Sequence, residues 1–443
     1  MIPQLRDLEQ QFPNELVVVG VHSGKYTAER DTARIRDASI RLGNTHPVVN
    51  DRQFRVWRSY AVNAWPTIVI VSPTGYVVGQ QAGEFTAEMI APAIEQLIAA
   101  CDADGTLDRT PRHFEPDPPV MAPGLLRYPG KVIVDGDRIA IADTGHGRVL
   151  AGTLDSSGTR MRVARAIGQE GPWNAESRTA NTFIWPLGMA WKGDTLFVAD
   201  AGHHAVFAAE LDGPSRMIAG TGHQIRVRAD LTNGSLSSPW DVALAGDTLY
   251  IASAGSHQIH SLDLAGASLD SLARDPAGRA RRLRVHAGTR REDIADGPNA
   301  GAALAQPMAI AAAAGRLYFA DAETSAIRWC DTDAAGDTHT LVGTGLFDFG
   351  DKDGAGDDVR MQHQQGVAAR SSGQLLIADS YNDALKWLDP ATRRADVWVR
   401  GLHEPGGVSI GKQYAYVADT NAHRVMLAHL ETGELSELEI ENE

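Results

Sequence analysis

The feature that most constrains this chain is a segment that occurs six times after residue 137. Each copy is a short apolar strand that ends in Ala-Asp or a close variant, followed by a tight turn and a second strand, as in TLFVADAGHHAVF from Thr195. One such strand pair cannot bury both of its faces, so the copies must pack on one another. The strands end at positions 57, 53, 68, 58 and 40 residues apart, namely Asp143, Asp200, Ser253, Asp321, Asp379 and Asp419.

A second recurrent feature lies upstream of these copies, where a proline opens an earlier strand, as in WPLGMAW at Pro186. Five copies have this proline, and the remaining one has Gln364 in its place. Two aligned strand signals in units of this length are typical of propeller blades with loops of variable length. We therefore predict an all-β, six-bladed β-propeller over residues 125–443. The final GELSELEIE predicts an outer strand for blade six, and hence a ring that closes without strand exchange.

Residues 1–100 have a different pattern, in which strand and helix signals alternate. ELVVVGVHSG indicates a buried strand, AERDTARIRDASIRLG an amphipathic helix, and PTIVIVSPTGYVVGQQAG a strand pair that is followed by another helix. The order predicts an α/β domain, and the polar, proline-rich residues 101–124 predict a linker. We expect strands at about 16–21, 67–71 and 76–81 in one sheet, and helices at about 26–41 and 86–99.

Charge and cysteine content exclude several classes of function. The 443 residues carry a formal net charge of -15, which argues against nucleic acid or anionic lipid as a partner, while RARRLR around Arg281 leaves a local basic patch open. No apolar run has the length of a membrane span, and the first residues lack the pattern of a leader peptide, so we expect a cytoplasmic protein. Cys101 and Cys330 are the two cysteines and suggest neither a disulfide framework nor a metal site.

The strand motif LYxADxxxxxI resembles the NHL repeat, and the first region, with WPT and SPTG, resembles the thioredoxin-like (redoxin) fold. Together they resemble the two-domain family of NHL repeat-containing protein 2 and its bacterial relatives. In the thioredoxin-like family a Cys-x-x-Cys pair precedes the first long helix, where its thiols have a lowered pKa. MIPQLRDLEQQF resembles the stretch that follows this motif. The resemblance therefore implies a domain that is incomplete at its N-terminus, redox-silent as given, and left with exposed sheet edges and apolar surface.

Trp65, Pro66 and Thr67 form the first candidate binding site. An X-Pro bond at a strand entry is a candidate for the cis form, and in the resembled fold the cis-proline loop borders the substrate groove. We therefore interpret this loop as a surface that accepts a peptide. The alternative is an ordinary strand start with a tryptophan in the core.

The second candidate site is the mouth of the propeller channel, where we expect the residue after each proline. Aromatic and methionine side chains there suit a peptide or protein segment, whereas the alternative is that these residues only plug the channel. We expect Trp240 to be partly exposed on the same side as the Trp65 loop, so that both domains face one cleft. The candidates are Leu187, Trp240, Met308 and Gln365, with Gly130 and Gly406 at the two remaining positions.

Other residues suggest chemistry but are better explained by structure. An aspartate that recurs in one turn is expected to accept backbone N–H groups there. His204, His257 and His423 share one position of the repeat and are expected to pack in turns rather than to bind metal. Asp351, Asp353 and Asp357 lie in the loop at 347–358, whose spacing is similar to that of a calcium loop. Asp296 occupies the matching place one blade earlier, which favours a connection between blades.

Three functions remain open at this point. The first, which we favour, is a scaffold that binds a protein or peptide. The second is a thiol–disulfide oxidoreductase whose dithiol is encoded upstream of Met1, and the third is a metal-dependent hydrolase or lyase in the propeller. No nucleophile elbow, P-loop or dinucleotide motif occurs, so we expect no catalytic residue, metal or cofactor. We expect neither nucleic acid nor membrane as a partner, and the oligomeric state stays open.

Overall fold

The computed structural model describes residues 2–83, 85–112, 114–115, 125–168, 183–210, 214–225 and 233–441. The chain divides into two compact units, residues 1–121 and residues 122–443. Part of the predicted linker, at 113 and 116–124, lies outside the described residues. No described helix is both long enough and apolar enough to span a bilayer.

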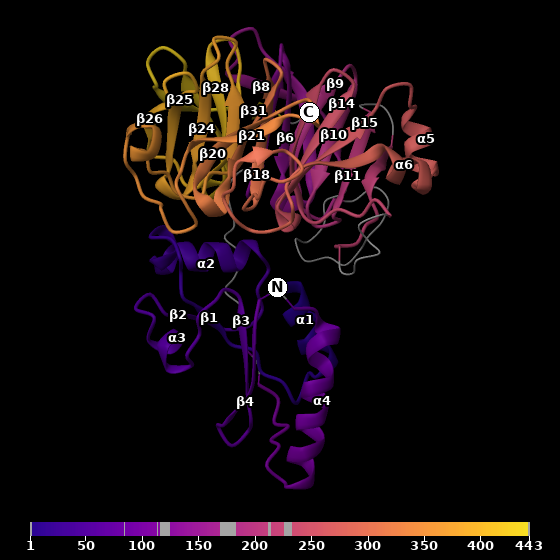
Figure 1. The fold of residues 1–443 in the computed structure, drawn as a ribbon, viewed down its shortest axis with the longest axis vertical. Coiled ribbons are helices and arrows are strands. Elements are labelled where there is room, and N and C mark those ends of the chain that lie inside the picture. Colours follow the sequence, from indigo (N-terminus) through magenta and orange to yellow (C-terminus); the bar gives the residue numbers. More distant parts are fainter. Residues whose placement is uncertain are drawn as a thin grey trace. The chain divides into compact units, whose positions relative to one another are not determined.

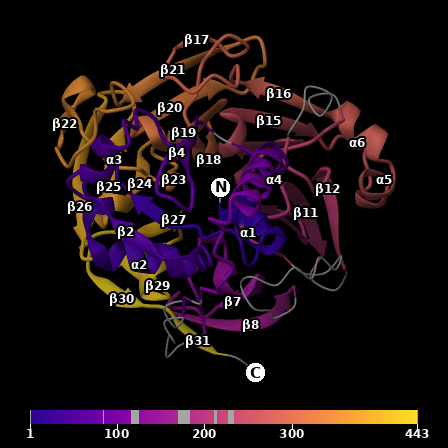
Figure 2. The same ribbon diagram turned by 90° about the horizontal axis from the view of Figure 1, so that it is seen from below.

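Six sheets form the C-terminal unit, and they lie as blades around one axis, which confirms the predicted six-bladed propeller (Figures 1 and 2). The first strand of each blade contacts the first strand of the next, and the last of them contacts β5, so the ring is closed. From blade 1 to blade 6 these first strands are β5 (Lys131–Asp135), β9 (Pro186–Lys192), β13 (Pro239–Ala245), β18 (Pro307–Ala313), β23 (Gly366–Ala369) and β27 (Pro405–Ile410).

The second strand of every blade ends at one of the six anchor residues, as predicted. These strands are β6 (Arg138–Asp143), β10 (Thr195–Asp200), β14 (Thr248–Ser253), β19 (Arg316–Asp321), β24 (Leu375–Asp379) and β28 (Tyr414–Asp419). The third strands are β7 (Arg148–Leu154), β11 (Ala205–Glu210), β15 (Gln258–Asp263), β20 (Ala326–Asp331), β25 (Ala384–Asp389) and β29 (Arg424–His429). The fourth strands are β8 (Arg160–Ile167), β12 (Ser215–Gly220), β16 (Leu283–Ala287), β21 (Asp337–Val342), β26 (Arg394–Arg400) and β30 (Leu435–Glu437).

Three blades have a short fifth strand: β17 (Gly297–Pro298) in blade 4, β22 (Gly354–Ala355) in blade 5 and β31 (Glu439–Glu441) in blade 1. The last of these corrects our prediction of ring closure. Blade 6 has its own outer strand β30, but the chain then continues to β31, which pairs in parallel with β8 of blade 1. Leu438 is buried between the two strands, and the Arg160 side chain on β8 forms ion pairs with both glutamates of β31.

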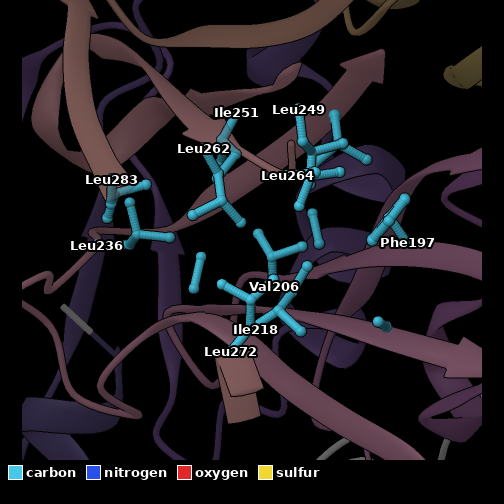
Figure 3. Close-up of a cluster of buried hydrophobic side chains, with 14 residues drawn as sticks. Phe197, Val206, Ile218, Leu236, Leu249, Ile251, Leu262, Leu264, Leu272 and Leu283 are labelled. Carbon is cyan, nitrogen blue, oxygen red and sulfur yellow. The ribbon is translucent and has the colours of Figure 1, made fainter. Parts of the chain in front are cut away.

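Neighbouring blades are held together by apolar cores (Figure 3). Because side chains alternate along a strand, Phe197 and Ala199 of β10 face the core shared with blade 3, whereas Leu196 and Val198 face the core shared with blade 1. Both faces are therefore buried, which explains why the repeated strands are apolar throughout. The insertion between β15 and β16 forms α5 (Leu269–Arg274) and α6 (Pro276–Arg282) at the periphery of blade 3 (Figure 2), and Leu272 joins the core.

The N-terminal unit combines helices with short strands. Its core lies between α1 and α4, where Leu8, Ile90 and Ile94 pack with Ile68 and Ile70 of β3. In chain order its elements are α1 (Ile2–Gln11), β1 (Gly20–His22), α2 (Thr32–Arg41), β2 (Val48–Asn50), α3 (Arg55–Ser59), β3 (Thr67–Val71), β4 (Val77–Ala82) and α4 (Ala87–Ala103).

The strands of this unit form two sheets, so our prediction of a single sheet was wrong. The strand β1 pairs with β2 in parallel, and β3 pairs with β4 antiparallel. No described strand lies between β1 and β3 to hydrogen-bond with both of them. The helix α2 also begins later than expected, because the Asp31 carboxylate accepts the N–H groups of Ala33 and Arg34 and caps the helix there.

Candidate functional site

The anchor residue at the end of each second strand is fully buried and ties that strand to the start of its blade. The Asp200 carboxylate accepts the backbone N–H groups of Ile184 and Trp185, at 2.9 and 2.8 Å, which precede β9. It also accepts the N–H groups of Gly202 and His203 in the turn. The recurrent aspartate therefore has a structural role, as expected.

Four of the five aspartate anchors form an ion pair with an arginine or lysine of their own blade. Asp321 lies 2.9 Å from the guanidinium of Arg328, which is fully buried. Blade 3 has Ser253 instead of aspartate, and its hydroxyl lies 3.0 Å from His260 Nδ1. Burial lowers the pKa of His260 to about 4, so the imidazole is neutral at pH 7. At this anchor position, blade 3 therefore has neither a carboxylate nor a charged partner for one.

The histidines at the shared repeat position join adjacent blades. His204, His257 and His423 have φ angles of 50°, 52° and 57°. In each case Nδ1 accepts a backbone N–H from the residue that precedes the proline position of the following blade. The bond from Tyr128 to His423 spans blades 6 and 1 and so contributes to ring closure. These residues lie in turns, as predicted, and they also bond to the following blade.

The loop at 347–358 is neutralised by basic side chains. Lys386 Nζ lies 2.9 Å from Asp351 and 3.2 Å from Asp353, and Arg393 lies 2.6 Å from Asp357. One blade earlier, Arg328 binds Asp296 at 3.0 Å, which supports the predicted equivalence of the two connections. Among the described residues, no group of three or more His, Cys, Asp or Glu side chains is arranged to hold a metal ion.

Lys131, two residues after Pro129, reaches across the propeller axis from blade 1. Its Nζ lies 3.3 Å from Asp241 Oδ2 of blade 3 and 3.3 Å from the Met308 carbonyl oxygen of blade 4, and it also donates to the Gln365 carbonyl of blade 5. Both charged side chains are buried. Burial lowers the pKa of Lys131 and raises the pKa of Asp241, and each charge opposes the shift of the other group.

Small residues at the same position in the other blades make room for this axial ion pair. A Cβ atom on Gly188 would lie 2.0 Å from Asp241 Oδ1, and one on Gly407 would lie 2.5 Å from Lys131 Cδ. Protein atoms therefore fill the axis at this level. We did not predict the pair, although the sequence has one lysine, one aspartate and four small residues at the second position after each proline position. Those residues are Lys131, Gly188, Asp241, Ala309, Gly366 and Gly407.

The predicted residues at the channel mouth differ in their exposure. Leu187 and Met308 are buried, whereas Trp240 and Gln365 are half-buried. The Trp240 ring lies 5.8 Å from that of Trp185 and packs against Met308. Gly130 and Gly406 are buried. Binding at this mouth stays a prediction, as does the single cleft shared by Trp240 and the Trp65 loop.

In the N-terminal unit the Trp65–Pro66 peptide bond is cis, as predicted. Trp65 is 45% exposed, so it is not the core tryptophan of the alternative interpretation. Its indole N–H donates to the Ser23 carbonyl at 2.8 Å. The Trp65 ring lies 4.5 Å from the ring of Trp57 and 6.3 Å from that of Phe54, and we call these three side chains the aromatic cluster.

Asp51 holds this cluster in place. Its carboxylate accepts the N–H groups of Arg55, Val56 and Trp57 at the start of α3, at 2.7, 3.1 and 2.9 Å, and the hydroxyl of Ser23 at 2.9 Å. Burial raises the pKa of Asp51, but these four donors outweigh it and lower that pKa below its ordinary value. We did not predict a role for Asp51, Phe54 or Trp57, although the high aromatic content of residues 54–65 indicates such a site.

Neither cysteine of the chain is placed for thiol exchange. Cys101 is buried in α4, and Cys330 is buried in β20. Burial raises the pKa of Cys330 to about 12, which keeps it in the unreactive thiol form at pH 7.

Comparison with known proteins places these observations in a family. No family model matches the chain. The chain is 32% identical to Protein SUPPRESSOR OF QUENCHING 1, chloroplastic, of Arabidopsis thaliana, over 99% of its own length. It is 31% and 30% identical to NHL repeat-containing protein 2 of Gallus gallus and Homo sapiens, over 100% and 99% of its length. It spans 43% of the length of the first relative and 66% of the length of the other two.

Solved structures resemble the chain more distantly. A nidogen/laminin complex gives a TM-score of 0.46 at 18% identity and covers 67% of this chain and 91% of its own. A streptogramin B lyase gives 0.44 at 9% identity and covers 72% and 86%. Because these TM-scores are low, we draw no conclusion about function from the solved structures.

The sequence identity along the full length and the six NHL-type blades together show that this chain belongs to the NHL repeat-containing protein 2 family.

Proposed function

We propose that this chain is a peptide-binding scaffold, in which the Trp65–Thr67 loop binds an extended segment of a partner protein. The observation that carries the proposal is the state of Trp65, which is fixed by its bond to Ser23 and still 45% exposed. Rigid, exposed tryptophans are typical anchors of binding surfaces, since they bury a large area at low entropic cost.

The backbone at this loop supports the same proposal. Trp65 directly precedes Pro66 and strand β3, and its N–H and C=O form no hydrogen bond with any other residue that the structure describes. An extended peptide pairs with such groups in the manner of an added strand. The order of elements from α1 to α4 also supports the thioredoxin-like assignment made from the sequence. The propeller would then be a rigid body, with Trp240 and Gln365 as the accessible candidates for further contacts.

The test is a selection from displayed random peptides on the immobilised full chain, followed by affinity measurements with labelled peptides. We expect Trp65→Ala to weaken the selected peptides about tenfold or more, because hot-spot tryptophans contribute at that level. Tyr76→Ala is the matched control, since this aromatic residue of the same unit is 74% exposed but lies outside the aromatic cluster, and we expect unchanged affinity. Selected peptides that bind Trp65→Ala and wild type equally would contradict the proposal.

A further inference from the structure

The segment that carries the aromatic cluster also carries several exposed arginines. Arg52, Arg55 and Arg58 belong to the turn before α3 and to α3 itself, the helix that carries Trp57. All three are exposed. Arg30 adds a fourth cation, with its guanidinium 5.8 Å from the centre of the Phe54 ring.

These arginines are not neutralised by carboxylates. Among the described residues, Arg52 and Arg55 form no ion pair, and Arg58 donates instead to the Gln53 carbonyl at 2.8 Å. The segment 51–65 contains one acidic residue, Asp51, which is buried and already accepts four hydrogen bonds.

The acidic residues next to Arg30 are also engaged. Glu29 accepts the backbone N–H of Tyr26, and Asp31 caps α2. The surface is therefore cationic, although the whole chain carries a formal net charge of -15. Exposed arginines without a carboxylate partner bind carboxylates well, because the guanidinium offers paired donors to the two carboxylate oxygens.

We propose that the aromatic cluster and Arg52, Arg55 and Arg58 form one recognition surface for an acidic peptide that contains an aromatic residue. The inference rests on the proposed function and specifies its ligand. The aromatic side chain of the peptide stacks on Trp65 and Trp57, and flanking glutamates or aspartates pair with the arginines. Asp51 and Ser23 are positioning residues, since they hold the start of α3 and the indole of Trp65.

The experiment uses three synthetic peptides with the same central Phe-Trp pair and with flanks of glutamate, glutamine or lysine. Fluorescence anisotropy measures their affinity for the full chain at low and at high salt. We expect the glutamate peptide to bind at least about fivefold more tightly than the glutamine peptide, with an advantage that shrinks as salt rises. The lysine peptide should bind most weakly.

The second part of the experiment tests variants of the arginines. The double variant Arg55→Gln/Arg58→Gln should remove most of the preference for the glutamate peptide, and Arg55→Glu/Arg58→Glu should reverse it toward the lysine peptide. Arg281→Gln is the matched control, because Arg281 is 71% exposed on α6 of the propeller, and it should leave the preference unchanged. Circular dichroism checks that each variant is folded, which we expect because the replaced side chains are exposed.

Each outcome separates the two proposals. Equal binding of the glutamate and glutamine peptides, with both lost in Trp65→Ala, would overturn the charge inference and keep the peptide-binding scaffold. If none of the three synthetic peptides binds while peptides selected on the full chain do, the charge inference is overturned and the scaffold is kept; if no displayed peptide binds either, both are overturned. A single-stranded oligonucleotide of equal charge that binds as tightly as the glutamate peptide would overturn the assignment to a peptide ligand.

Discussion

The two units of this chain differ in where they keep their apolar surface. Fourteen large apolar side chains are exposed among the described residues, and twelve of them lie in the N-terminal unit, which has 121 of the 443 residues. The propeller contributes Val285 and Phe347. The propeller blades therefore bury their apolar side chains against one another, whereas the N-terminal unit exposes apolar side chains of the kind that mark interaction surfaces.

Free strand edges occur in both units. In the propeller, β31 covers the outer strand β8, whereas β12, β16 and β30 each have one edge with no partner among the described strands. In the N-terminal unit, β1 and β3 each have one edge with no partner among the described strands. Val17, Val19 and Val21, in or next to β1, are 49, 51 and 42% exposed. Such edges accept added strands, and exposed apolar side chains accompany them chiefly in the N-terminal unit.

The largest effect is expected from breaking the axial ion pair. Lys131→Met leaves Asp241 as a buried carboxylate without its cation, and such changes cost about 3–5 kcal/mol. Urea unfolding should show this loss in the propeller transition, with the transition of the N-terminal unit unchanged.

The control for this prediction is the double variant Lys131→Met/Asp241→Asn, which also removes the stranded charge. It should recover more than half of the lost free energy of unfolding. If both variants have the same free energy of unfolding as wild type, the axial ion pair does not stabilise the propeller.

A smaller effect is expected from pH. The folded pKa of His260, about 4, lies below its ordinary value of 6.5, so the unfolded chain binds the proton more readily. This contribution to stability is present above pH 6.5 and is lost as the pH falls toward 4, by about 2 kcal/mol between pH 7 and pH 5. His260→Gln should flatten the pH dependence of the unfolding free energy by that amount. An unchanged slope in the variant would show that His260 is protonated in the folded chain.

The smallest effect on stability is expected at the exposed valines. Val19→Thr should change the free energy of unfolding by less than about 0.5 kcal/mol and should reduce the binding of a hydrophobic dye. Val198→Thr, at a fully buried site of β10, buries an unpaired hydroxyl and should cost about 1–3 kcal/mol. Equal costs at the two sites would contradict the contrast between the units.

The repeated strands could be predicted from the sequence, whereas contacts between residues that are far apart in the chain could not. The six second strands could be located because their apolar pattern and anchor residue are local, and each occurs in every blade. The three-residue strand β31 could not, because its pairing with β8 depends on contacts between the two ends of the propeller. The axial pair was missed for a similar reason, since Lys131 meets groups from three other blades.

In the N-terminal unit the Trp65–Thr67 loop was found from its local motif, but its surroundings were not. Nothing local to Trp65 reveals Ser23, whose carbonyl binds the indole from 42 residues away. The short helix α3 was also missed, because its five residues are stabilised by the Asp51 carboxylate rather than by an amphipathic pattern.

We expect a peptide to bind the N-terminal unit at the aromatic cluster, while the propeller axis stays closed. Hydrogen–deuterium exchange of the full chain, with and without a saturating amount of the glutamate peptide, distinguishes these two regions. We predict slower exchange over residues 51–67, and no change over residues 129–131, 239–241 and 307–309, which line the axis. Protection confined to those axial residues, with none over residues 51–67, would contradict the account.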